Sequence, residues 1–329
     1  MRPPSNEITM TVPAESDPPR RRRRSDGSLV RRARSKWLRD LSEKTIELLL
    51  LAAALVSIVA TVGIVWVLVK ESLPFFEHVS VREFLTGRVW TPLFSEPSYG
   101  VLPLLCGTLV TTFVALGLAI PVGTVAAIFL SEYAPVRLRE GVKPVLELLS
   151  AVPTVVYGYF ALLFVTPALQ RVFPDLPSFN MLGAGLVMGV MIIPYVSSLS
   201  EDAMRAVPMD LREGSFAMGA TRLQTSFKVV VPSAFSGITV AYILAISRAV
   251  GETMVVAIAA GMQPSFTLDP REPAATITAF IVQVSLGDLP HGTVGYQSIF
   301  VVGLTLMCVT FLFNVIGHWL RKRFRETYS

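Results

Sequence analysis

Long runs of apolar residues are the feature that most constrains what this chain can fold into. A helix needs about 20 mostly apolar residues to cross the roughly 30 Å of hydrocarbon in a bilayer. Six stretches meet this requirement, at approximately residues 46–69, 104–130, 145–169, 181–199, 233–260 and 299–320. Hydrophobic residues make up 52% of the chain and charged residues only 16%, which favours the bilayer as solvent. The sequence therefore predicts an all-α integral membrane fold with six transmembrane helices in one domain, residues 44–329.

Basic residues cluster at both ends of the chain, beside the first and last runs. Arginine fills positions 20–24, further basic residues continue to Arg39, and four more lie between 321 and 325. Basic residues that flank a span stay preferentially in the cytoplasm. We therefore expect a multi-pass protein of the plasma membrane with both termini cytoplasmic, an arrangement that an even number of spans satisfies.

Residues 1–43 form the basic N-terminal tail. They are rich in Pro, Ser, Asp and Arg up to about Arg39 and lack apolar periodicity, a composition typical of disorder. Binding of nucleic acid is one alternative role for such an arginine run. The position beside a first span instead favours a role in setting topology and touching anionic lipid. The first span is too long for the core of a signal peptide and lacks a clean cleavage site, so we expect it to be retained.

Residues that carry catalytic or metal chemistry are sparse. The two cysteines and three histidines are scattered, and no G-x-x-x-x-G-K-[ST] loop is present. We therefore expect no catalytic residue, no metal site, no cofactor and no ATPase activity in this chain.

Proline and glycine residues occur inside the predicted spans. Pro121, Pro153 and Pro194 lie inside three of them, where proline removes a backbone donor and kinks a helix. Gly185 and Gly189 have the GxxxG spacing, which allows close approach of a neighbouring helix.

A polar segment, residues 201–232, interrupts the apolar sequence. Asp210 and Glu213 have the spacing of a capping box, in which the first side chain caps a helix and the second reaches back to it. The pattern predicts a helix from there to about Met218. Gly219 should end it, because glycine most easily takes the left-handed conformation at a helix end.

A second helix is predicted directly after that glycine. Thr221 and Gln224 repeat the capping-box spacing, and Pro232 is expected to open the next span at a first-turn position. The result is helix, turn, helix on the cytoplasmic face. A DNA-binding unit of this kind needs a soluble body and a recognition helix free to enter a groove. Since this segment is tied to the bilayer at both ends, a docking element for a cytoplasmic protein fits better.

The polar segment also resembles the EAA loop of bacterial ABC-importer permeases. The matching residues are Glu213, Gly214 and Ser215, then Gly219 and Ala220, and finally Val229, Val231 and Pro232. In that family the loop is the coupling helix that sits in a groove on the ATPase subunit. Gly-Ser replaces the usual Ala-Ala here and Val replaces Ile and Leu, changes that keep the small and apolar character.

Four longer segments resemble the phosphate-importer permeases of the PstC type. They are GTLVTTFVALGLAIPVGTVAAIFLSEYA, LELLSAVPTVVYGYFAL, ISRAVGETMVVAIAAG and TITAFIVQVSLGD, and FLTGRVWTP favours this subunit over its sister, PstA. The resemblance implies a type I ABC-importer permease fold in a bacterial cell membrane. It also implies three kinds of partner: a PstA-type permease, two PstB-type ATPases that bind ATP and Mg, and an extracytoplasmic PstS-type phosphate-binding protein.

Two charged residues, Arg248 and Glu252, lie in the fifth run, where each costs on the order of 3 kcal/mol to insert. Four positions apart on one helix, they share a face and can pair across one turn. Arginine offers bidentate donors to a phosphate oxyanion, and the carboxylate can accept a proton from hydrogen phosphate and repel a fully ionised oxyanion. The alternative is that the pair only locks this helix to a neighbour.

Two rival functions stay open at this stage. One keeps the ABC architecture and changes the cargo to sulfate or molybdate. The other is a secondary transporter or channel that works alone, which predicts inverted repeats and midplane ion ligands and leaves the polar segment without a role. A further apolar stretch, residues 274–286, is too short to span and is expected to lie in the interface or re-enter the outer leaflet, near a binding protein.

Overall fold

The computed structural model describes residues 27–94, 96–287, 290 and 292–323, and the side chains of 28–42, 321 and 323 lie outside this description. Over these residues the fold is helical, with one isolated β-bridge between Trp90 and Tyr99. The chain divides into two compact units, residues 1–63 and 64–329. The predictions made for residues 1–26 and 324–329 fall outside the described residues.

The first helix runs through the boundary between the two units. Helix α1 spans Gly27–His78, and its apolar part, Glu43–His78, is long enough to cross a membrane. Residues 27–43 of the tail, for which disorder was expected, form the start of this helix in the structure. Four Arg and three Leu are the most frequent good helix formers among these residues.

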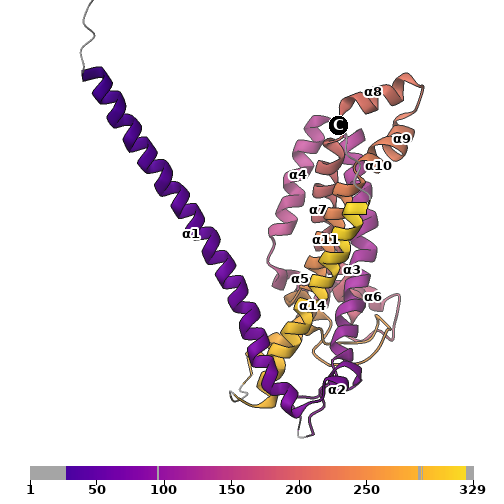
Figure 1. The fold of residues 1–329 in the computed structure, drawn as a ribbon. Coiled ribbons are helices and arrows are strands. Elements are labelled where there is room, and N and C mark those ends of the chain that lie inside the picture. The colour runs from indigo at the N-terminus through magenta and orange to yellow at the C-terminus, as the bar shows by residue number, and fades with distance from the viewer. Residues whose placement is uncertain (1–26, 95, 288–289, 291, 324–329) are drawn as a thin grey trace, which may run out of the picture. The chain divides into compact units, whose positions relative to one another are not determined.

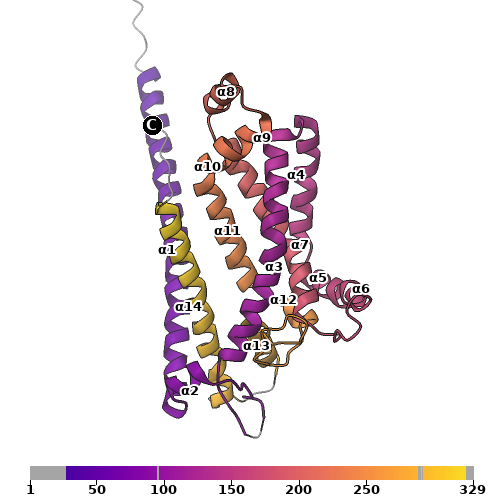
Figure 2. The ribbon, with the colours of Figure 1, turned by 90° about the vertical axis from the view of Figure 1, so that its right-hand side faces the viewer.

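The second unit is a bundle built around three helices that run side by side (Figure 1). These are α3, α7 and α11, and Figure 2 shows α8 and α9 at one end of them and α2 and α13 near the other. The remaining bounds are as follows: α2 Val81–Thr86, α3 Leu102–Ile128, η1 Phe129–Tyr133, α4 Val136–Ala151, α5 Thr154–Phe160, η2 Ala161–Val165, α6 Thr166–Gln170, α7 Met181–Arg205, α8 Met209–Ala217, α9 Arg222–Thr225, η3 Ser226–Val230, α10 Val231–Ser233, α11 Phe235–Val250, α12 Met254–Ala259, α13 Ile277–Ser285 and α14 Val294–Arg323.

Four helices in the described part of the chain are long and apolar enough to cross a membrane by themselves. Two further pairs pass the same test together, so the number of spans reaches six if each pair counts as one. The pairs are sharply bent, by 86° between Val136–Ala151 and Thr154–Gln170 and by 71° between Arg222–Ser233 and Phe235–Val250. The span predicted over 145–169, with a kink at Pro153, consists of two helices, α4 and α5, in the structure. Pro153 sits between α4 and α5, before the first residue of α5, so it separates two helices instead of kinking one.

Each of the three π-helical turns ends two residues before a proline. These turns, η1, η2 and η3, precede Pro135, Pro167 and Pro232. Proline has no N–H and its ring crowds the carbonyl four residues earlier. Widening the turn moves the preceding hydrogen bonds back to the fifth residue, as in Val231 N–H to Ser226 O, and relieves that conflict.

The core of the bundle rests on close contact between α3 and α7. A Cβ added at Gly189 would lie 2.8 Å from the carbonyl oxygen of Ala115, and one at Gly185 would lie 2.7 Å from the side chain of Val114. Only glycine permits this approach, so the packing role predicted for the GxxxG pair is confirmed. Buried Ala119, Met188 and further apolar residues of α5, α11 and α12 complete this cluster.

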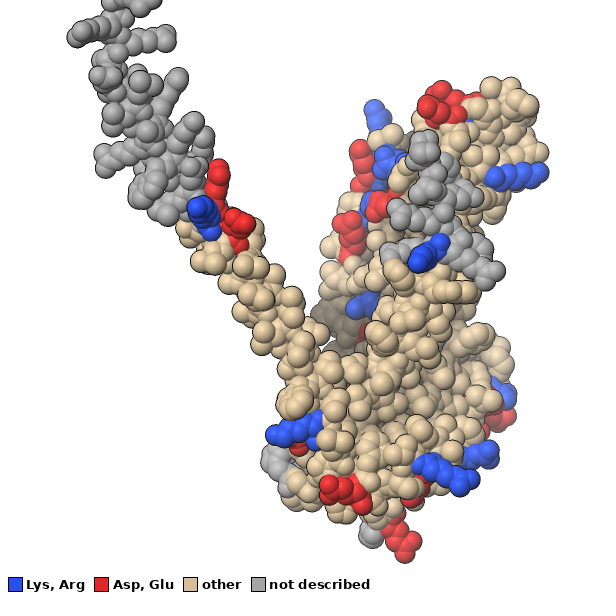
Figure 3. All heavy atoms as spheres, in the orientation of Figure 1, with Lys and Arg blue, Asp and Glu red and all other residues tan. Residues whose placement is uncertain are grey.

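Charge is distributed as a membrane protein requires. In the second unit, Lys, Arg, Asp and Glu side chains gather mainly toward the two ends, with a broad band of uncharged side chains between them (Figure 3). Many large apolar residues of this unit are exposed in the isolated chain, including Phe113 and Val125 of α3 and Phe311 of α14. Such a surface is stable only when lipid or other protein chains cover it.

Candidate functional site

The polar segment 201–232 forms helix, turn and helix, as predicted. It differs from the prediction at residues 201–205, at Asp210 and at Pro232. Its first five residues, 201–205, are the last turn of α7. Helix α8 then runs from Met209 to Ala217, and α9 begins at Arg222. Between them Gly219 has a φ of +83°, the left-handed conformation expected of a glycine that ends a helix.

Only one of the two predicted capping boxes forms. Thr221 and Gln224 make both reciprocal bonds, from Gln224 N–H to Thr221 Oγ1 at 3.3 Å and from Thr221 N–H to Gln224 Oε1 at 2.9 Å. Asp210 does not cap α8. The N-cap is Pro208, two residues earlier, with an extended ψ of 143°. Asp210 therefore lies inside the first turn, where its charge still favours the helix dipole.

Pro232 occupies a first-turn position, as predicted, but in the short helix α10 and not in the next long helix. It lies near the end of the helical stretch Arg222–Ser233, and the chain then bends by 71° into α11. The π turn η3 lets this stretch run on through the proline.

The residues predicted to contact an ATPase lie on an accessible part of the segment. Glu213, Gly214 and Gly219 are exposed, while Ser215 and Ala220 are half-buried. The Ser215 hydroxyl lies 2.9 Å from that of Thr225 and ties α8 to the end of α9. Apolar side chains are also exposed here, among them Phe216, Leu223 and Met218, the last with 89% of its surface accessible. Exposed apolar side chains beside charged ones are typical of a contact surface for another protein.

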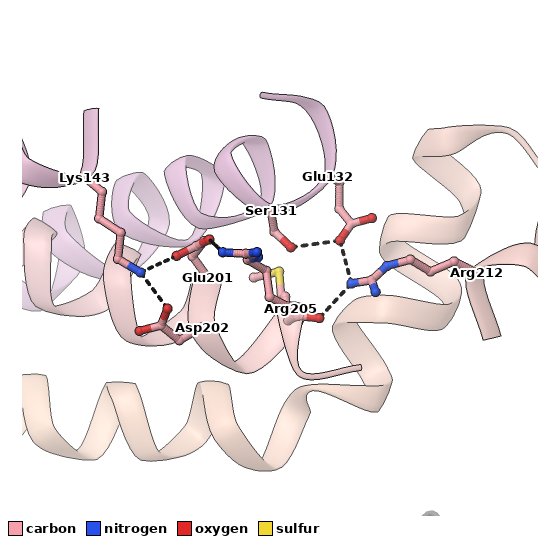
Figure 4. A network of polar contacts seen from close by, with 8 residues as sticks. Ser131, Glu132, Lys143, Glu201, Asp202, Arg205 and Arg212 are labelled. Carbon is pink, nitrogen blue, oxygen red and sulfur yellow. Dashed lines mark hydrogen bonds and ion pairs between the residues drawn. The ribbon is translucent and has the colours of Figure 1, made fainter. Parts of the chain in front are cut away.

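Sequence reasoning missed Arg212, the residue directly before Glu213. Its guanidinium donates to the carbonyl oxygens of Met204 and Val207, at 2.8 and 2.7 Å. One nitrogen lies 3.1 Å from Glu132 Oε1 (Figure 4). The Ser131 hydroxyl donates to the same carboxylate oxygen at 2.9 Å. Glu132 is 80 residues away in sequence, so no local pattern could have revealed the pair.

A second group of charges ties α4 to α7. The Lys143 ammonium lies 2.8 Å from Glu201 Oε2 and 2.6 Å from Asp202 Oδ1, and Arg205 approaches Glu201 Oε1 at 3.6 Å (Figure 4). Only 1% of the Glu201 side chain is exposed. A carboxylate buried this deeply is tolerable because two cations face it.

A cleft lies beside the Arg212–Glu132 contact. It has a volume of about 640 Å³ and is lined by Glu132 and by three arginines, Arg205, Arg212 and Arg222. Among the described residues no cluster of His, Cys, Asp and Glu could hold a metal ion.

The two charges of the predicted substrate pathway lie close in sequence but not on one helix. Helix α11 ends at Val250, three non-helical residues follow, and α12 begins at Met254. The predicted continuous helix over 233–260 is therefore wrong, and so is the pairing of Arg248 with Glu252 across one turn, because the structure shows no ion pair between them. Hydropathy gave no sign of this break, since apolar residues flank it on both sides.

Arg248 contacts an aromatic ring instead. Its guanidinium carbon lies 4.9 Å from the ring centroid of Tyr195 on α7. Its Nε is buried and has no hydrogen-bond partner. A cation above an aromatic face is stabilised without using its N–H donors, so this arginine retains donors for another group.

Glu252 belongs to the break between α11 and α12. Its side chain is buried, with 6% exposed, and Oε1 accepts a long bond of 3.4 Å from Val255 N–H. Its own carbonyl oxygen accepts a bond of 2.6 Å from the Thr278 hydroxyl on α13. The Thr278 bond anchors the break to α13, which lies within the short apolar stretch 274–286.

Comparison with known proteins defines the class. A profile of the family described as "Binding-protein-dependent transport system inner membrane component" matches residues 119–326. This match covers more than half of the chain, which therefore belongs to that family and is a multi-pass inner membrane component of a transport system.

Individual relatives are similar over most of the chain. The probable ABC transporter permease protein YqgH of Bacillus subtilis is 36% identical over 88% of this chain and 94% of its own length. The phosphate transport system permease protein PstC of Mesorhizobium japonicum is 31% identical over 73% of this chain and 78% of its own. PstC 1 of Mycobacterium tuberculosis is 35% identical over 70% and 74%.

Solved structures agree on the fold. A bacterial ABC transporter that imports the acidic polysaccharide alginate matches with a TM-score of 0.61, at 14% identity, over 88% of this chain and all of that one. The MetNI methionine ABC transporter in an inward-facing conformation matches with a TM-score of 0.51, at 20% identity, over 69% and 95%. The predicted all-α fold of a type I ABC-importer permease is thus confirmed.

Proposed function

We propose that this chain is a transmembrane permease subunit of an ATP-driven importer of inorganic phosphate. The observation that carries the proposal is the similarity to phosphate transport permeases named PstC, at 31% to 35% identity over 70% or more of the chain. The chain contributes half of the translocation pathway. A PstA-type permease contributes the other half, and two PstB-type ATPases that bind ATP and Mg supply the energy.

The polar segment 201–232 is the part proposed to meet the ATPase. Glu213, Gly214 and Phe216 are exposed on α8, and exposed Met218 follows directly after it. They support this role because they offer charge and apolar area close together. With this segment and both termini in the cytoplasm, the opposite end of the bundle receives phosphate from a PstS-type binding protein.

Arg248 is the residue proposed to bind the phosphate oxyanion in the pathway. The unpaired donor Nε and the aromatic support from Tyr195 favour this role. Glu252 lies four residues further on, at a break in the helix, where a carboxylate can accept the proton of hydrogen phosphate. The alternative cargo, sulfate, carries no such proton at neutral pH and would be repelled by the Glu252 carboxylate.

Uptake by cells tests the proposal. Radiolabelled phosphate and sulfate are supplied to cells lacking this gene and complemented with the wild type, Arg248→Ala or Glu213→Lys, and membrane assembly is checked in parallel. We expect phosphate uptake with the wild type only, and no sulfate uptake. Normal phosphate uptake by an assembled Arg248→Ala complex would reject the substrate role, and uptake of sulfate in place of phosphate would select the alternative cargo.

A further inference from the structure

The side chain of Arg212 joins three elements that the chain brings together at the end of the bundle. It extends from α8 and reaches the last turn of α7 through the Met204 carbonyl, the loop after α7 through the Val207 carbonyl, and η1 through Glu132. The turn η1 continues α3 directly. One guanidinium therefore connects α8 to both members of the tightly packed α3–α7 pair (Figure 4).

The contact is protected from solvent. Only 12% of the Arg212 side chain and 9% of the Glu132 side chain are exposed. Withdrawing these charges from water is costly, and the cost is offset only because the carboxylate, two carbonyls and the Ser131 hydroxyl supply partners. The Met204 carbonyl belongs to the last turn of α7, where a cation is also favoured by the helix dipole.

Helix α8 has few other attachments. None of its residues is buried. Leu211 packs partly against the apolar cluster that contains Met204, Val207 and Val230, and Ser215 contacts Thr225. The Arg212 contacts are therefore the main polar link between α8 and the α3–α7 pair.

We propose that Arg212 and Glu132 form a clamp that transmits movement of α8 to α3 and α7. This inference rests on the proposed function, because it needs α8 to be moved by an ATPase. A helix that docks on a partner but is held loosely at its other side would move without carrying the membrane helices along. Arg212 thus acts as a positioning residue that determines how much transport each ATP hydrolysed produces.

Arginine is required for this geometry. A planar guanidinium reaches two carbonyls and a carboxylate at once, whereas the ammonium of lysine is a point charge on a flexible stem. Arg212→Lys keeps the positive charge and removes the planar set of N–H donors. Glu132→Gln keeps the shape of the side chain and removes its negative charge. Arg137, exposed at the start of α4 and without an ion pair to any described residue, provides the matched control Arg137→Gln.

The test uses the complete complex with its sister permease, ATPases and binding protein in proteoliposomes. ATP hydrolysis and uptake of inorganic phosphate are measured in the same sample. We expect Arg212→Lys and Glu132→Gln to assemble and to keep ATP hydrolysis within about twofold of wild type. Phosphate taken up per ATP should fall about fivefold or more, a typical coupling between two sites. The double variant should lose little more than either single one, since both remove the same link.

Three results would overturn the clamp. Transport per ATP could stay normal in both variants, both activities could fall together, or both variants could fail to assemble, which would make the pair a requirement of folding. Arg137→Gln should leave the ratio unchanged. A failure of the proposed function is distinguishable from all of these, because the wild-type complex itself would then show no ATP-dependent phosphate uptake.

Discussion

The guanidinium of Arg248 lies over the ring of Tyr195, 4.9 Å from its centroid, and links the last turn of α11 to α7. This contact explains how an arginine can be held in the apolar band of the bundle without a carboxylate partner. The ring stabilises the cation through its face and leaves the N–H donors unused. An anion that enters the pathway would find a charge already in position.

Replacement of Tyr195 tests this arrangement. Tyr195→Phe retains the aromatic face, so the KM for phosphate should stay within about twofold of wild type. Tyr195→Leu removes a contact of about 0.5 to 2 kcal/mol and should raise KM about 2- to 30-fold. Concentration-dependent uptake of labelled phosphate provides the measurement. Equal KM values for all three proteins would show that the ring does not position the arginine.

Glu252 is expected to affect selectivity more than structure. Glu252→Gln keeps an oxygen that can accept the bond from Val255 N–H, and the Thr278 bond goes to the backbone carbonyl, so the break should persist. Removing the negative charge should allow a fully ionised oxyanion to compete. Excess sulfate should then inhibit phosphate uptake by the variant and not by wild type. If sulfate has no effect on either protein, Glu252 does not select against it.

Gly219 is predicted to be sensitive to any side chain. At a φ of +83°, Gly219→Ala should cost about 1 to 2 kcal/mol, although a Cβ there meets no neighbour. Gly141→Ala is the matched control, because Gly141 also has open space around it but lies inside helix α4. The control should be neutral or slightly stabilising. Melting temperatures of the two purified variants give the comparison, and an equal change in both would contradict the prediction.

Local patterns in the polar segment could be predicted where a single side chain decides the backbone. Gly219 and the box formed by Thr221 and Gln224 are such cases, because each depends only on residues within three positions. The prediction that Asp210 caps α8 is wrong, because Pro208 takes the N-cap position two residues earlier. The misplacement of Pro232 has a similar origin: a π turn carries the helix past the proline, and no simple periodicity signals that turn.

Close packing of α3 against α7 gives a further prediction. Gly189→Ala places a methyl group 2.8 Å from the Ala115 carbonyl, and such overpacking should cost about 1 to 3 kcal/mol. Gly117→Ala, on α3 with no atom within 4 Å of the new Cβ, should be tolerated. Thermal unfolding in detergent compares the two, and equal stability would mean that the helices can separate slightly at no cost.

The fold was largely predictable because apolar runs of spanning length leave few alternatives. The candidate sites were less so. Arg248 and Glu252 could be identified because charge is rare in such runs. The helix break that contains Glu252 could not, because it is held by Thr278 of α13, which donates to the Glu252 carbonyl. The Arg212–Glu132 pair is set by tertiary packing across 80 residues. Both features require knowledge of which helices are neighbours.

Phosphate uptake by proteoliposomes tests whether this chain is part of an ATP-driven phosphate importer. The purified complex of this chain with its sister permease and ATPases is reconstituted with ATP enclosed and the binding protein outside, and labelled phosphate is followed over time. The account predicts accumulation that requires both enclosed ATP and this subunit, and that Arg248→Ala abolishes it. Accumulation without ATP, or undiminished accumulation with Arg248→Ala, would contradict the account.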